Sequence, residues 1–229
     1  MSVITDGSGS TGQPRLAQTE ALLASTGAAA RAPFGTMTDT DIYQGLLAGD
    51  HAPLVALAGE LAETLIEERI ELVACDALEG YNPTHDLCSL ITGAAVQVAA
   101  RHGRAVRAYE FAVVGAGDPT VEGRLTHELT GERLAAKIAA ARDYARAAGD
   151  VLTREVEELL ATAGPGAFSH EHLVPQPTSP LAARFAGSRP FFEIHGERRV
   201  REGKYRKALR LHDHLLPFER ALDAWAAAA

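Results

Sequence analysis

The chain has 229 residues, of which 46% are hydrophobic and 23% charged, so it is long enough to bury one sizeable core and is not disordered, collagen-like or fibrous. Its net charge of −8, from 30 acidic and 22 basic residues, argues against a nucleic-acid or anionic-membrane surface. No apolar run approaches the roughly 18 residues needed to cross a bilayer, and the first residues do not resemble a signal peptide. We therefore expect a cytoplasmic protein.

The first half of the chain alternates between strand-like and helix-like segments. Residues 3–5 read as a short strand that runs into a Gly/Ser-rich turn over 7–12, and the leucines from 16 to 23 predict a helix that ends at Gly27. Residues 35–41 read as a loop, and leucines at helical spacing predict a second helix over 54–66. This order is typical of an α/β protein.

A strand, a polar loop and a helix follow. Residues 70–75 predict the strand, 76–86 the loop and 87–100 the helix, and residues 104–114 predict one more strand. Alternation of this kind indicates a mostly parallel sheet with helices on both faces. The two cysteines, Cys75 and Cys88, have no metal-finger spacing and are interpreted as core or near-core residues.

The second half is predicted to be helical. Residues 130–144 and 152–163 read as helices that meet near Gly149, a Pro-rich stretch follows in which no strand is convincing, and 200–226 reads as a helix broken near Pro217. His170 and His172, in the Pro-rich stretch, are interpreted as residues of a polar surface loop. The basic stretch 197–207 is interpreted as a solvated helix surface.

The loop over 76–86 is where this fold would place a site, since ligands of open α/β sheets bind beyond the carboxyl ends of the strands. Pro83 and Thr84 resemble a helix start, which puts His85 and Asp86 in the first turn of the next helix. An imidazole there can reach a ligand at the strand ends. The alternative is that these residues only cap the helix.

Several segments resemble the PIG-L/LmbE-like zinc N-deacetylases. Residues 3–7 are similar to the family's second strand, which ends in Thr-Asp-Gly, and 20–27 are similar to its Glu-led helix. Residues 82–85, Asn-Pro-Thr-His, are similar to its His-Pro-Asp-His loop. The resemblance covers about residues 1–115. It implies a Rossmann-like three-layer α/β sandwich with a helical C-terminal half, and an activity that removes N-acetyl groups from amino sugars or related small molecules.

The chain also departs from the family pattern. The family's first strand ends in His-Pro-Asp-Asp, which supplies two zinc ligands and the base, and this motif is absent here. The chain begins where the family's second strand begins, so one strand-helix unit is expected to be missing. Only His85 carries over as a metal ligand, while Asn82 stands where the family has an oxyanion-stabilising His and Thr84 replaces its Asp. Because one ligand cannot hold zinc tightly, we expect zinc to be bound weakly or not at all.

The sequence therefore assigns residue roles as hypotheses. We expect His85 to be a metal ligand and Asn82 and Asp86 to be catalytic. Four further residues are expected to bind the substrate: Asp6, Arg15, Glu79 and Tyr81. We expect residues 1–229 to form a single domain with a small-molecule substrate and no nucleic-acid or membrane partner. The sequence does not decide whether the chain forms a homo-oligomer.

Three functions remain open from the sequence. In the first, the chain is a deacetylase-type hydrolase whose first strand is not in this sequence. In the second, it is a Rossmann-like binding or partner protein that has no catalytic activity. The third is an unrelated α/β enzyme that uses Asp6, Glu79, His85 and Asp86 without a metal.

Overall fold

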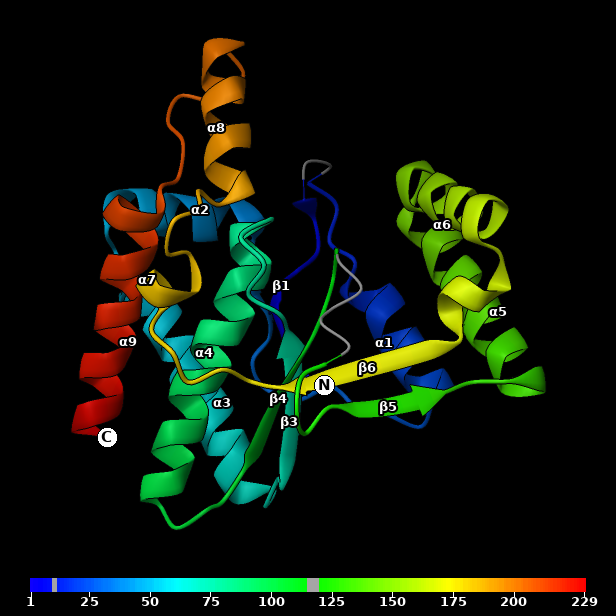
Figure 1. Ribbon diagram of the computed structural model, residues 1–229, viewed down its shortest axis with the longest axis horizontal. Helices are drawn as coiled ribbons and strands as arrows, with labels where there is room; N and C mark the ends of the chain where they lie inside the picture. The colour runs from blue at the N-terminus through cyan, green and yellow to red at the C-terminus, as the bar shows by residue number, and fades with distance from the viewer. Residues whose placement is uncertain (10–11, 115–119) are drawn as a thin grey trace.

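The protein is an α/β molecule in which short strands lie between two groups of helices (Figure 1). The computed structural model describes residues 1–9, 12–114 and 120–229. The described strands are β1 Val3–Thr5, β2 Phe34–Met37, β3 Leu72–Asp76, β4 Arg107–Phe111, β5 Leu125–Glu128 and β6 His170–Pro175. The described helices are α1 Leu16–Ser25, α2 Asp39–Ala48, α3 Ala52–Glu67, α4 Pro83–Arg101, α5 Gly131–Ala148, α6 Asp150–Ala163, α7 Leu181–Arg184, α8 Phe191–Arg201 and α9 Leu216–Ala228.

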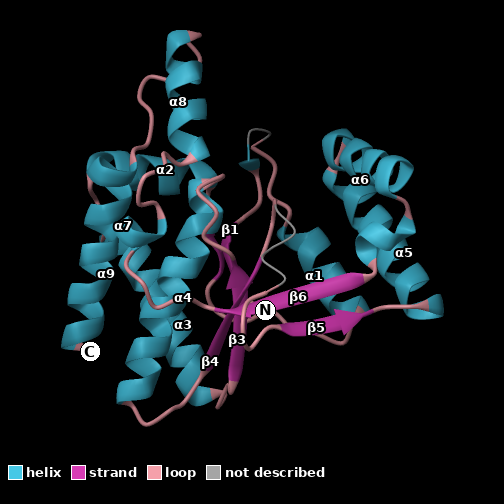
Figure 2. Cartoon of the chain, in the orientation of Figure 1, coloured by secondary structure: helices cyan, strands magenta, loops and turns pink. Residues whose placement is uncertain are grey.

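The described strands form two small sheets (Figure 2). In the first, β1 runs parallel to β2; in the second, the order is β3-β4-β6-β5, with β3 parallel to β4 and the other neighbours antiparallel. The α/β class is therefore confirmed. The expected single, mostly parallel sheet is not what the structure describes, because β1 and β3 are not paired with each other and β5 and β6 run antiparallel.

The main core lies on one side of the strands. Helices α3, α4 and α9 pack together there, with Leu57 of α3, Leu87 of α4 and Phe218 of α9 almost fully buried, and Ile4 of β1 joins the same cluster. Helices α1, α5 and α6 lie on the opposite side (Figure 1). On that side the Thr19 hydroxyl of α1 lies 3.4 Å from the Tyr144 hydroxyl of α5.

Most elements of the first half match the sequence-based expectation. Strands β1, β3 and β4 lie within the predicted ranges or extend them by one residue, and Gly27, just past α1, has the left-handed φ of 72° that such a position favours. Both cysteines are free, and Cys75 is buried, as expected. The predicted turn over 7–12 falls partly on residues 10–11, which lie outside the described residues.

The interpretation of residues 35–41 as a loop is wrong. Strand β2 occupies Phe34–Met37 and α2 begins at Asp39. The strand is short and includes Gly35 at a φ of 64°, so it carries no alternating pattern. Helix α2 begins with a capping box, in which the Thr38 hydroxyl accepts the Asp41 N–H and the Asp41 carboxylate accepts the Thr38 N–H.

The expectation that the second half contains no strands is also wrong. Strands β5 and β6 pair over Leu125–Glu128 and His170–Leu173, so His170 and His172 lie in a strand and not in a loop. Every residue of β5 is exposed. Since neither face of β5 is buried, no hydrophobic alternation marks it, and side-chain contacts such as that of Arg124 with His172 add to the backbone pairing.

The C-terminal helix differs from the prediction as well. Helix α8 ends at Arg201, Gly203 follows at a φ of 71°, and α9 starts only at Leu216 after a π turn over Leu211–Leu215. Pro217 lies in the first turn of α9, where its missing N–H costs nothing, so it does not break the helix. No helix in the described part of the chain is long and apolar enough to cross a membrane.

Candidate functional site

His85 and Asp76 form a hydrogen-bonded pair at the carboxyl end of β3. Asp76 is the last residue of the strand and His85 lies in the first turn of α4, as the sequence predicts. The imidazole Nδ1–H donates to Asp76 Oδ2 at 2.5 Å, and the two side chains are 40% and 22% exposed. This contact fixes the ring and leaves Nε2 for a ligand.

The electrostatic surroundings of His85 favour its protonated form. The hydrogen bond to Asp76 raises the pKa of His85 above its ordinary value, and partial burial opposes this effect. The negative charges of Asp76, Asp86 and Asp39 add to the rise in pKa. Asp39 begins α2, directly after β2, so the carboxyl end of the first sheet lies close to that of the second.

Asn82 is the N-cap of α4. Its side-chain Oδ1 accepts the N–H of Thr84 at 3.0 Å and the hydroxyl of Tyr43 at 3.4 Å. Burial raises the pKa of Tyr43 to about 12, so this hydroxyl keeps its proton and stays a donor. Because the Asn82 oxygen is engaged twice, the group left to meet a ligand is its Nδ2 amide, which can only donate.

Asp86 lies beneath the loop. The residue is 0% exposed, and its Oδ1 accepts the N–H groups of Glu79 at 2.9 Å and Gly80 at 3.0 Å. Its Oδ2 has no hydrogen-bond partner among the described residues. Burial raises the pKa of Asp86 to about 7. In this geometry Asp86 holds the loop backbone and does not face a substrate at the surface.

Glu79 and Tyr81 connect the same loop to other parts of the chain. The Glu79 carboxylate accepts the N–H groups of Val113 and Val114, each at 3.0 Å, just after β4. Tyr81 is 49% exposed and stacks on Phe191 of α8, with ring centroids 5.0 Å apart. Tyr81 is therefore available to a ligand, whereas the described contacts of Glu79 are structural.

Asp6 and Arg15 lie at the carboxyl end of β1. Asp6 Oδ1 accepts the Ser8 N–H at 2.9 Å, and the backbone N–H of Arg15 donates to the Asp6 carbonyl at 2.7 Å. The turn then reaches α2, where the Gly9 N–H donates to Asp39 Oδ2 at 2.9 Å. Through Asp39, this turn and the His85 loop belong to one region of the molecule.

The part of this region that the structure describes does not contain a set of metal ligands. Among the described residues no group of three or more His, Cys, Asp or Glu side chains is placed to hold a metal ion. His85 offers one nitrogen, and Asp76 is committed to the other ring nitrogen. A tetrahedral zinc site with an open position needs three protein ligands, so the described residues do not fit zinc on their own.

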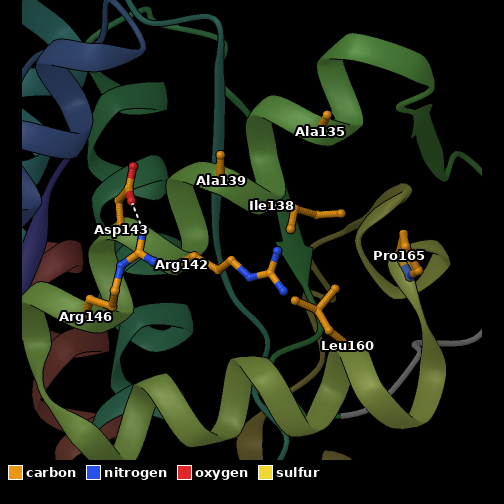
Figure 3. A pocket seen from close by; sticks show the side chains of 8 residues that line it. All are labelled: Ala135, Ile138, Ala139, Arg142, Asp143, Arg146, Leu160 and Pro165. Atoms are coloured by element: carbon orange, nitrogen blue, oxygen red, sulfur yellow. Dashed lines mark hydrogen bonds and ion pairs between the residues drawn. The ribbon is translucent and has the colours of Figure 1, made fainter.

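A separate cavity of about 490 Å³ lies between α5 and α6 (Figure 3). Ile138 and Leu160 supply its apolar part, and Arg142 and Arg146 line it. Arg142 is held by a bidentate contact to Glu157 at 2.7 and 2.8 Å, and Arg146 is paired with Asp143. None of the predicted site residues lines this cavity, and its arginines are already paired.

The sequence reasoning missed Asp39 and Tyr43, which contribute charge and a hydroxyl beside His85 and Asn82. Both lie on α2, in or beside the segment that was interpreted as loop. The Thr38-x-x-Asp41 spacing was the available signal for that helix. Comparisons of the chain with protein families, with curated proteins and with solved structures find no match.

Proposed function

We propose that the parallel strands β1 to β4 are parts of one Rossmann-like sheet in the order β2-β1-β3-β4. The crossover from one parallel strand to the next is right-handed in nearly all proteins. A helix that moves to the other face of the sheet therefore means that the next strand is added in the opposite direction. Helices α3 and α4 pack together on one side, whereas α1 lies on the other (Figure 1). The chain therefore moves from β1 to β2 in one direction and from β2 through β3 to β4 in the other.

This order has its reversal point between β1 and β3, and ligands of such sheets bind in the crevice at that point. Asp6 follows β1 and the Asp76–His85 pair follows β3. Asp6 and His85, which the sequence indicates as site residues, thus lie on either side of the crevice in which such sheets bind their ligands. We propose this crevice as the ligand site.

The function that we propose is that of an N-deacetylase-type hydrolase site for an N-acetylated amino sugar or a related small molecule, similar to the PIG-L/LmbE proteins. The observation that carries it is the Asp76–His85 pair in the first turn of α4, with the Asn82 amide on the same turn. His85 Nε2 can accept or hold a proton at the acyl group. The Asn82 Nδ2 amide can donate to the acyl oxygen.

The described residues supply only part of such a site. The described residues give one oriented imidazole and one amide donor, and they do not assemble the ligand set that would activate a water molecule. We therefore expect the 229-residue chain to bind an N-acetyl group without releasing acetate. The incomplete ligand set also favours a second candidate function, a binding protein that kept the scaffold without the chemistry.

Isothermal titration with N-acetylglucosamine, and with glucosamine for comparison, tests the proposal. We expect the wild-type chain to prefer the N-acetylated sugar and His85→Ala to weaken its binding by at least tenfold. His127→Ala, on the exposed strand β5, is the control and should bind as the wild type does. Equal binding by wild type and His85→Ala, or no binding by the wild type, would contradict the proposal.

An acetate-release assay then separates the candidates. Turnover that persists with a chelator and disappears in His85→Ala would favour the third function, a metal-free enzyme. Binding without turnover is the outcome that we expect for this chain.

A further inference from the structure

A second cavity, of about 470 Å³, lies where the chain turns back after α8. Its wall is formed by the C-terminal end of α8 and by residues 207–214, which return toward the body of the molecule (Figure 1). The basic stretch 197–207, interpreted from the sequence as a solvated helix surface, therefore supplies part of a cavity wall. None of the predicted site residues lines this cavity.

Close contacts hold the two parts of the wall together. Gly196 of α8 packs against Ala208, since a Cβ at Gly196 would lie 3.0 Å from the Ala208 Cβ. The buried Glu193 carboxylate accepts the N–H of Leu211 at 2.6 Å. Leu209 and Leu211 are 5% and 4% exposed and belong to the main core. The returning segment is therefore anchored in the core, which fixes the shape of the cavity.

The cavity carries positive charge that the chain does not compensate. Residues 197–214 include seven of the 22 Lys and Arg residues and only three of the 30 acidic residues, although the whole chain has a net charge of −8. Three of these cations pair with Glu202, which does not line the cavity. Arg201 and Lys207 do line it, and neither has a hydrogen bond or an ion pair with any described residue. Both are available to an anion.

The other polar groups of the lining have distinct roles. Glu197 accepts hydrogen bonds from Arg189 and Arg210, each at 2.7 Å, so its charge is compensated. The Arg210 N–H donates to His214 Nδ1 at 2.9 Å, which leaves the proton of the neutral ring on Nε2 as a further donor. The exposed Asp213 carboxylate has no partner in the described part of the chain. The lining therefore combines donors for an anion with one free acceptor.

We propose that this cavity binds a small phosphorylated molecule that also carries hydroxyl groups, such as a sugar phosphate. The Arg201 guanidinium offers paired N–H groups to phosphate oxygens, and the Lys207 ammonium adds a point charge. Asp213 repels a second phosphate group but accepts hydrogen bonds from hydroxyl groups, so it favours a hydroxyl-bearing monoester over a polyphosphate. A volume of about 470 Å³ suits such a ligand, because small-molecule sites span roughly 300–1,000 Å³.

This inference goes beyond the proposed hydrolase function, because the cavity shares no residue with the His85 site. A small ligand fits the observations better than a long polyanion does. The two free cations line a cavity, and the net charge of −8 opposes a nucleic acid that would extend over the rest of the surface.

Isothermal titration of the full 229-residue chain with glucose 6-phosphate, inorganic phosphate and glucose, at about 0.15 M salt, tests the proposal. We expect the wild type to bind one molecule of glucose 6-phosphate with a Kd below about 1 mM, inorganic phosphate more weakly and glucose not measurably. Arg201→Gln and Lys207→Gln should each weaken binding of both phosphates by at least about tenfold. Arg133→Gln removes the same charge from an exposed position on α5 and should bind as the wild type does.

Asp213→Ala separates a binding role from a loss of folding. This variant should lose the preference for glucose 6-phosphate yet bind inorganic phosphate at least as tightly as the wild type, because it removes a negative charge. No binding of glucose 6-phosphate by the wild type, equal binding by wild type and Arg201→Gln, or a full preference kept in Asp213→Ala would overturn the proposal. Binding of heparin without binding of glucose 6-phosphate would also overturn it and assign these cations to a surface for polyanions.

Discussion

The contact between Asp76 and His85 determines what this histidine can do. A ring held at Nδ1 by a carboxylate presents a defined Nε2, and the raised pKa makes protonated His85 more stable than in a free peptide. The residue therefore keeps its proton to a higher pH than a free histidine does. The neighbouring Asn82 amide donates a hydrogen bond at any pH. His85 and Asn82 together therefore offer a ligand one group whose charge depends on pH and one donor whose charge does not.

Replacing Asp76 by Asn should lower the pKa of His85. The neutral amide can still accept the Nδ1–H, but the substitution removes the largest influence that raises the pKa, so partial burial is opposed only by the charges of Asp86 and Asp39. The His85 Hε1 resonance followed against pH measures this value in both chains. An unchanged midpoint would show that Asp76 does not control His85.

The same pKa shift gives a pH dependence of stability. Since the pKa of His85 is raised on folding, the stabilisation is fully present below the ordinary histidine pKa and is lost as pH rises through the folded value. Wild type should therefore exceed Asp76→Asn in stability by more at pH 5 than at pH 8. Urea denaturation at both pH values measures the difference.

The chain should hold well under one equivalent of zinc after dialysis. His85 is one ligand, and the described residues provide no group of three that could complete a site. Elemental analysis of the dialysed protein measures the content. Stoichiometric zinc that is lost in His85→Ala would contradict this and would mean that Asp6, Glu79 or Asp86 has been recruited as a ligand.

At the scale of elements, the loop from β3 to α4 is fixed to the C-terminal segments. The Phe192 N–H of α8 donates to the Gly80 carbonyl, and Arg184 of α7 reaches Glu110 of β4. The position of the His85 turn therefore depends on helices that are distant in sequence. Two changes test these connections.

Gly80→Ala should destabilise the protein more than Gly103→Ala. Both glycines have a positive φ, 69° and 73°, so each substitution costs about 1 kcal/mol in backbone strain. A Cβ at Gly80 would also lie 2.6 Å from Phe185, whereas one at Gly103 meets nothing within 4 Å. Urea denaturation should show an excess loss of about 1–3 kcal/mol for Gly80→Ala. Equal losses would show that the loop is not packed against Phe185.

Arg184→Met should lower the free energy of unfolding by about 3–5 kcal/mol, because it leaves a buried carboxylate without its charge partner. Glu110 is 2% exposed and accepts two hydrogen bonds from Arg184, at 2.9 and 3.1 Å. Adding Glu110→Gln to this variant removes the buried charge and should restore part of the loss. A double variant no more stable than Arg184→Met would refute this explanation.

The elements that could be predicted from the sequence are those with a buried face. Leucines at helical spacing mark α3, and the apolar run before Asp76 marks β3, because both bury side chains in one core. Strand β5 is exposed along its whole length and β6 is at most half-buried, and both depend on pairing with other strands, which no local pattern reveals. His85 was placed correctly in its turn, since Pro83 is a local start signal, but its contacts with Asp76 and Asp39 are tertiary.

At the scale of the whole molecule, the two sheets bring their carboxyl ends to one region. The turn after β1 bonds to Asp39, and Asp39 acts on His85 after β3. A ligand at this point would touch segments from both sheets.

The most direct measurement of the central claim is an NMR titration of the wild-type chain, labelled at Asn and His side chains, with N-acetylglucosamine. We predict that the Asn82 Nδ2 amide and the His85 Nε2 signals shift together and saturably, while the signals of His127 and His170 on the β5–β6 pair do not move. Shifts confined to that pair, or no shift at Asn82 and His85 at saturating sugar, would contradict the assignment of the ligand site to the carboxyl ends of β1 and β3.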